Sequence, residues 1–101
     1  MASVEPSHWP TAEHEDLFAT IASLRTSDEA HHFLRDLCTR AELDAMAHRW
    51  QMARLLDEGL PYLEVAKRTH ASTTTVTRVA QWLHRGEGGY ALALRRRSRR
   101  S

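Results

Sequence analysis

Hydrogen-bonding side chains that carry no negative charge are concentrated between positions 72 and 81 of the chain. Such side chains can donate to, or accept from, the edges of bases in the major groove of DNA. A carboxylate would repel the phosphate backbone, and none occurs between positions 65 and 86. If the segment is helical, these side chains form its outward face: Ser72, Thr73, Thr74, Thr77, Arg78 and Gln81. They are candidates for reading a DNA sequence.

The same region has the spacing of a helix-turn-helix, the motif that places such a face in the major groove. Ala66 is the small residue needed where the second helix crosses the first, and residues 69–71 can form the tight turn. Val76 and Val79 follow Ala66 by ten and thirteen residues, where inward aliphatic side chains must hold the second helix. The spacing predicts helices over residues 61–68 and 72–84.

Two positions depart from the usual motif. Glycine is common at the sharp turn because the backbone there needs a positive φ, whereas this chain has His70. Histidine is tolerated in that region, so we expect strain without failure of the turn. Pro61 stands where a serine or threonine would cap the first helix, which leaves Glu64 without the partner of a capping box.

The formal net charge of +1 hides a strong asymmetry along the 101 residues. Residues 1–66 carry five basic and twelve acidic side chains, a net charge of −7, whereas residues 67–101 carry nine basic side chains and one acidic one, a net charge of +8. This asymmetry indicates an anionic partner such as nucleic acid. The bases around the second helix are placed to contact phosphates, which position a protein without reading sequence: Lys67, Arg68, Arg78 and Arg85.

Helical periodicity extends over most of the chain, and no segment alternates as a strand does. Capping boxes at residues 26–29 and 39–42 predict the starts of two helices, and Gly59 predicts the end of the second. A first helix is expected over residues 12–25 and a last short one over residues 90–96. We therefore predict an all-α protein with a flexible arm (1–10), a helical dimerisation body (11–59), a helix-turn-helix head with a terminal helix (60–94) and a basic disordered tail (95–101).

Several other classes of protein are excluded by the composition. Cys38 is the single cysteine, which rules out an internal disulfide and argues against a thiolate zinc cluster. The seven histidines lack the spacing and neighbouring ligands of a metal site, so we expect no metal and no cofactor. No nucleophile, base and oxyanion-stabilising group can be placed together, so we expect no enzyme.

The chain is expected to work in the cytoplasm, with the nucleoid when bound to DNA. It lacks an apolar run of the ~18 residues that a membrane helix requires, and it lacks a signal peptide. The arginine-rich tail is expected to contact the DNA backbone rather than anionic lipid. Of the tryptophans, Trp50 is expected in the core and Trp82 against the last helix, whereas Trp9 has no predicted role.

Five motifs between Thr39 and Tyr90 are specific enough to suggest a family. They are Thr-x-x-Glu-Leu at 39–43, Ala-Met-Ala-His-Arg-Trp at 45–50, Val-Ala-Lys-Arg-Thr at 65–69, Ala-Ser-Thr-Thr-Thr-Val-Thr-Arg-Val at 71–79 and Gly-Glu-Gly-Gly-Tyr at 86–90. With these motifs the chain resembles the YerC/YecD-type branch of the Trp repressor superfamily. The resemblance implies a Trp-repressor-like helical bundle that forms an intertwined homodimer. Such a dimer binds a near-palindromic site in double-stranded DNA, with half-sites ~34 Å apart.

The resemblance also implies a ligand site, which we expect to be vestigial. In tryptophan-responsive members the indole lies between two arginines, and the matching positions are Arg49 and Arg78, with Thr39 matching a residue near the ligand's amino group. The position after the second arginine is small in those members, but it is Val79 in this chain. We expect the valine to fill the ligand space, so that L-tryptophan is not the effector. For Arg49, on a core helix, we expect an internal salt bridge.

Two hypotheses about function follow. The first is a sequence-specific DNA-binding transcriptional regulator, with repression as the expected effect, that acts as a homodimer. The second is a dimeric helical protein-interaction module that keeps the fold without reading DNA. Binding to a selected palindromic duplex, lost when Thr74 or Gln81 is changed, distinguishes the first from the second.

Overall fold

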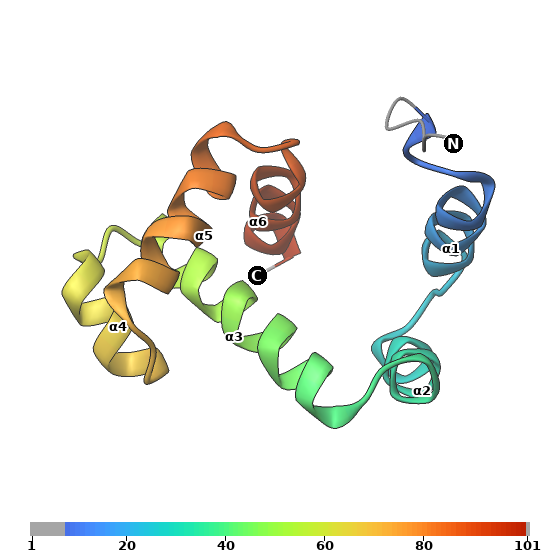
Figure 1. Cartoon of the computed structure of the whole chain (residues 1–101), viewed down its shortest axis with the longest axis horizontal. Helices are drawn as coiled ribbons and strands as arrows, with labels where there is room; N and C mark the ends of the chain where they lie inside the picture. The colour runs from blue at the N-terminus through green and yellow to red at the C-terminus, as the bar shows by residue number, and fades with distance from the viewer. Residues whose placement is uncertain (1–7, 101) are drawn as a thin grey trace, which may run out of the picture. The chain divides into compact units, whose positions relative to one another are not determined.

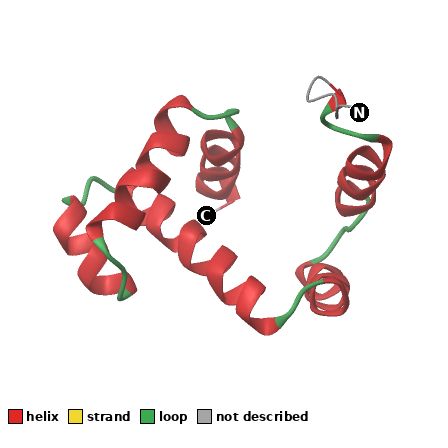
Figure 2. Cartoon of the chain, viewed as in Figure 1, coloured by secondary structure: helices red, strands yellow, loops and turns green. Residues whose placement is uncertain are grey.

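The structure, a computed structural model, describes residues 8–100, with side chains as far as residue 98. These residues form six α-helices and no strand (Figure 2), which confirms the prediction of an all-α protein. None of the helices in this range is long and apolar enough to cross a membrane. The chain divides into two compact units, residues 1–39 and residues 40–101. The predicted flexible arm falls mostly on residues 1–7, outside the described residues.

The first unit contains α1 (Ala12–Ala22) and α2 (Ser27–Leu37), and both helices begin at threonine caps. Thr11 Oγ1 accepts from the amide of His14, whose Nδ1 accepts from the amide of Thr11 at 3.0 Å. Thr26 Oγ1 accepts from the amide of Glu29 at 3.0 Å, as the predicted capping box requires. The Glu29 carboxylate accepts from the amide of Arg25, one residue earlier than in a standard box.

Neither helix of the first unit buries a residue. Phe18, Ile21 and Leu37 are 47%, 41% and 52% exposed, although large apolar side chains gain free energy by leaving water. The helices are therefore defined locally by their caps, not by a core within the unit. Helix α1 also ends at Ala22, three residues before the predicted end.

The second unit contains α3 (Arg40–Asp57), α4 (Tyr62–Thr69), α5 (Thr73–Arg85) and α6 (Gly89–Arg100). Helix α3 packs against the other three helices (Figure 1). Helix α3 ends at Asp57, and Gly59, predicted as the left-handed residue that ends it, follows with a φ of 93°. The amide of Gly59 donates to Leu56 O and that of Leu60 donates to Leu55 O, which is a Schellman motif.

The core of the second unit lies where α3, α4 and α5 meet. Seven buried residues form it, and the valines predicted to face inward are fully or almost fully buried: Met52, Ala53, Leu55, Val65, Ala66, Val76 and Val79. Trp50 packs against this core, in agreement with the prediction. Helix α3 thus shares a core with the helix-turn-helix, whereas the sequence-based boundary at residue 59 assigned it to a separate body.

Helix α6 is longer than predicted. It continues to Arg100, so the disordered tail expected from residue 95 is wrong for residues 95–100. Leu94 is 9% exposed and anchors the middle of the helix. Arginine is a good helix former because its straight side chain loses little rotamer freedom. The helix can therefore extend through a run of arginines.

Candidate nucleic-acid interface

The turn between α4 and α5 has the geometry that a helix-turn-helix requires. His70 adopts the left-handed conformation, with φ 56° and ψ 42°. Its amide donates to Lys67 O at 3.4 Å, and the amide of Ala71 donates to Ala66 O at 3.0 Å, which satisfies two carbonyls at the end of α4. Ser72 then caps α5 by accepting from the amide of Thr75 at 3.2 Å. The predicted turn is confirmed, and its histidine occupies a conformation that L-residues adopt at a cost.

The residues predicted to face outward on α5 are all exposed. They lie opposite Val76, Val79 and Ala80, which are at most 3% exposed. Two of the hydroxyl groups are engaged within the helix, since Ser72 caps it and Thr77 Oγ1 donates to Thr73 O at 2.8 Å. Within the described part of the chain, no hydrogen bond occupies the other four side chains: Thr73, Thr74, Arg78 and Gln81. These four side chains are available to a partner.

The basic residues that flank α5 differ in their surroundings. Lys67 and Arg85 are exposed on α4 and at the end of α5. The Arg68 Nε atom lies 3.0 Å from Glu64 Oε2, one turn earlier on α4, with the two side chains 56% and 39% exposed. Pro61 provides no side-chain cap to α4, as predicted, and Glu64 pairs with Arg68 instead. A pair this exposed contributes little to stability, so Arg68 can exchange it for a phosphate.

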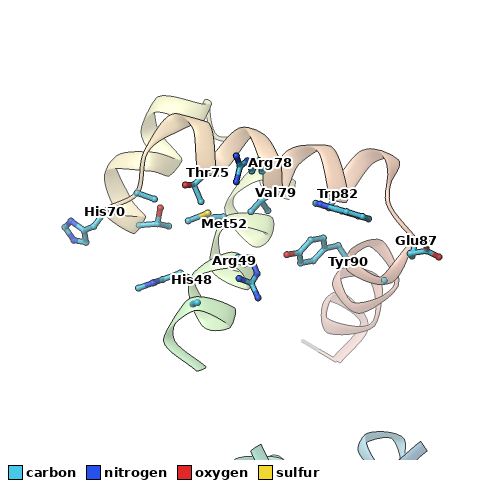
Figure 3. Close-up of a pocket in the computed structure, with 14 residues that line it drawn as sticks. His48, Arg49, Met52, His70, Thr75, Arg78, Val79, Trp82, Glu87 and Tyr90 are labelled. Atoms are coloured by element: carbon cyan, nitrogen blue, oxygen red, sulfur yellow. The ribbon is translucent and has the colours of Figure 1, made fainter. Parts of the chain in front are cut away.

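A cavity of about 710 Å³ lies beside the helix-turn-helix, between α3, α5 and the start of α6. Arg49 and Arg78 both line it, as Figure 3 shows, so the structure brings together the two arginines that the resemblance paired. Val79 forms part of its wall and is 3% exposed. Thr39 is not among the lining residues and belongs to the first unit.

The surroundings of Arg49 differ from the expectation. Among residues 8–98, Glu64 and Arg68 form an ion pair, whereas Arg49 forms none. The internal salt bridge expected for Arg49 is therefore absent from the described chain. Arg49 lines the cavity together with Arg78, His48 and His70, and Glu87 is the single acidic residue in the lining.

The aromatic residues near the cavity are only partly as predicted. Tyr90 stacks on Trp50, with ring centroids 6.3 Å apart and an angle of 15° between the planes. Trp82 is 62% exposed and lines the cavity, so the expectation that it packs against α6 is wrong. A Cβ atom at Gly86 would lie 2.8 Å from Trp82 Cε3, so glycine lets the backbone pass close to the indole.

Some lining residues were not predicted from the sequence, chiefly His48 and Ala45. Ala45, His48, Arg49 and Met52 follow one another at steps of three, one and three residues on α3. This spacing places them on one face of a helix, and that signal could have identified them. Among residues 8–100 no group of three or more metal-ligating side chains occurs.

The buried valines, the left-handed turn and the capped second helix define the class of the protein as a helix-turn-helix protein. The chain belongs to the Trp repressor family, because the family model for Trp repressor protein matches residues 12–98. It is 40% identical over 84 residues to YerC of Bacillus subtilis, an uncharacterised protein, covering 83% of this chain and 81% of YerC.

Two solved structures are similar over nearly the whole chain. A TrpR-like protein from Eubacterium eligens is 37% identical, with a TM-score of 0.84, covering 91% of this chain and 95% of that chain. A candidate Trp repressor from Staphylococcus aureus is 30% identical, with a TM-score of 0.83, covering 95% of this chain and 96% of that chain. These likenesses support both the fold and the family.

Proposed function

We propose that the chain is a sequence-specific DNA-binding regulator that represses transcription as a homodimer. One observation carries the proposal: α5 presents an exposed face without carboxylates, held in place by Val76 and Val79, which are fully and almost fully buried. Thr73, Thr74, Arg78 and Gln81 are the available side chains of that face. Arginine donates in bidentate fashion to guanine, and glutamine pairs similarly with adenine. The membership of the Trp repressor family supports the same conclusion.

Phosphate contacts would position α5 on the duplex. Lys67 and Arg85 lie exposed at the two sides of the helix-turn-helix, and Arg68 is held only by an exposed ion pair. Phosphate neutralisation supplies most of the sequence-independent affinity and makes that affinity fall as salt rises. The acidic residues of the chain lie almost entirely before position 67. The segment after position 67 therefore carries few carboxylates that could repel the phosphates of DNA.

A second copy of the chain is the partner that the first unit lacks. Two isolated helices of 11 residues each would be marginal in water, and their exposed apolar side chains gain stability only by burial. Interlocking with the same helices of another copy would bury Phe18, Ile21 and Leu37. The symmetric dimer would present two copies of α5 to half-sites ~34 Å apart on near-palindromic DNA.

We further propose that L-tryptophan is not the effector. Val79 forms part of the wall of the cavity that Arg49 and Arg78 also line. The resemblance implies a smaller residue at this position in tryptophan-responsive members, so we expect the branched side chain to take up part of the space that an indole would need. Calorimetry with L-tryptophan is expected to give no stoichiometric binding at micromolar concentrations, and such binding would refute this part of the proposal.

Selection of bound duplexes from random DNA tests the main proposal. Purified protein should enrich a near-palindromic sequence, and Gln81→Ala should relax the choice of base at one position in each half-site. Gln51→Ala is the matched control, since Gln51 is an exposed amide on α3 outside the reading face. Weak binding that ignores sequence in both the native chain and the variants would instead favour a helical protein-interaction module.

A further inference from the structure

Ser98 is the one hydroxyl residue within a run of arginines in the last part of α6. Arg95, Arg96 and Arg97 precede it, and two more arginines follow it. Ser98 is exposed and lies in the last turn of a helix that ends at Arg100. The side chain of Ser98 therefore lies at the surface of a strongly basic segment.

Thr69 shows why exposure matters as well as charge. It also follows two basic residues, Lys67 and Arg68, but it is 5% exposed and its hydroxyl donates to Val65 O at 2.7 Å. An enzyme that acts on a hydroxyl group in a basic segment could not reach Thr69 without unfolding α4. The same enzyme could reach Ser98 in the folded protein.

We propose that Ser98 is a phosphorylation site for a protein kinase that selects arginine-flanked hydroxyl residues. Such a kinase needs a negatively charged substrate groove, which the three preceding arginines complement. Ser98 Oγ attacks the γ-phosphorus of ATP, the bond from that phosphorus to the β,γ-bridging oxygen breaks, and ADP leaves. The hydroxyl proton passes to the kinase's catalytic carboxylate.

The surroundings of Ser98 explain what the phosphate would change. Ser98, Arg97 and Leu94 line a cavity of about 160 Å³ with Arg54 and Asp57 from the last part of α3 and with Glu58, which follows it. A phosphate carries a charge of about −1.5 to −2 at pH 7, which the carboxylates repel and the arginines attract. Phosphorylation would therefore cancel about two of the positive charges of that segment.

The effect on DNA binding rests on the function proposed above. The arginines of α6 would add sequence-independent phosphate contacts, and a phosphoserine among them would cancel about two of these. The slope of log K against log salt concentration would then become shallower by roughly 2 per chain. The choice of DNA sequence would not change, because the reading face of α5 is untouched.

Mass spectrometry of the full chain after incubation with ATP and an arginine-directed serine/threonine kinase tests the site. The expected result is about one phosphate per chain, located on Ser98, with retention in Ser98→Thr and loss in Ser98→Ala and in the Arg95→Gln, Arg96→Gln double variant. Absence of incorporation, equal incorporation into Ser98→Ala, or no effect of the arginine substitutions would overturn the proposal.

The salt dependence of DNA binding is measured on the same phosphorylated and unmodified samples. A shallower slope with an unchanged selected sequence supports the regulatory role, and an unchanged slope overturns it. Failure of the proposed function is distinguishable, because it would appear as absent sequence-specific binding in the unmodified chain. Failure of the site would appear as DNA binding by a chain that takes up no phosphate.

Discussion

The two units of this chain form helices equally well but differ in what holds them. In the first unit, Thr11 and Thr26 cap α1 and α2, yet no residue of either helix is buried. In the second unit, α3, α4 and α5 enclose a core that contains Val65 and Val76, both fully buried. Caps and periodicity decide where helices begin and end, whereas burial decides whether they form a fold. We expect the second unit to stay folded when its surface residues are changed. We expect the fold of the first unit to depend on contacts with a second copy of the chain.

The largest expected effect is on the core of the second unit. Val76→Asp places an uncompensated carboxylate where the side chain is 0% exposed, and the expected loss is about 4 kcal/mol or more. Thermal unfolding followed by circular dichroism should show no cooperative transition. Thr74→Asp adds the same charge two residues away on the exposed face, and it should unfold like the native chain.

The second prediction concerns the exposed apolar residues of the first unit. Phe18→Asp should weaken self-association at least ~10-fold, because a charged group would have to be buried in the interface. Analytical ultracentrifugation measures this shift towards monomer. Leu63→Asp changes an even more exposed residue, 75% exposed on α4, and it should leave the association unchanged. Equal effects of the two substitutions would contradict the proposed division between the units.

The third prediction tests the reading face. Arg78→Ala should weaken binding to the selected duplex by ~1 to 3 kcal/mol and relax the choice of one base. Arg85→Ala should weaken binding to all duplexes similarly and reduce the salt slope by about 1. Fluorescence anisotropy with selected and scrambled duplexes separates the two patterns. An unchanged affinity in Arg78→Ala would contradict a contact between Arg78 and a base, and would leave Arg78 with a role in the cavity alone.

The fourth prediction concerns the cap of α5. Ser72→Ala removes the acceptor for the amide of Thr75 and should lower the free energy of unfolding by about 1 kcal/mol, measured by urea denaturation. Ser72→Asp restores a capping oxygen and should recover most of that stability. It should nevertheless impair DNA binding, because it places a carboxylate on the reading face. The two substitutions at position 72 would thus show that the stability of the fold and the affinity for DNA depend on different properties of the side chain.

The smallest expected effect is at the turn. His70→Gly should raise the free energy of unfolding by about 0.5 kcal/mol, because glycine avoids the left-handed strain but loses more conformational entropy on folding. His70→Ala should give no gain, since alanine meets the same steric cost. Urea denaturation of both variants provides the measurement. A loss of stability in the glycine variant would show that the histidine ring contributes contacts that exceed the strain.

The elements that local chemistry determines could be predicted from the sequence. The caps at Thr26 and Ser72 and the left-handed residues at Gly59 and His70 follow from side-chain and backbone preferences that act over four residues. The inward placement of Val76 follows from helical periodicity. Each of these features lies where it was predicted.

The remaining features depend on contacts between distant segments. The stacking of Tyr90 on Trp50 joins α6 to α3. The unpaired guanidinium of Arg49 reflects which carboxylates the packing leaves nearby. Helix α6 extends past its predicted end because the helix propensity of its arginines prevails over their mutual repulsion.

The hydrogen bond from Thr77 Oγ1 to Thr73 O limits the kind of base contact that Thr77 can make. A hydroxyl group has one hydrogen to donate and two lone pairs to accept with, and in Thr77 the hydrogen is used by the helix. Against DNA this hydroxyl can act only as an acceptor. In the major groove the base-edge donors are the amino groups of adenine and cytosine. Every base pair presents one such amino group, so Thr77 distinguishes which strand carries it and not A·T from G·C. A 7-deaza purine, which lacks only a ring acceptor, should therefore bind there equally well.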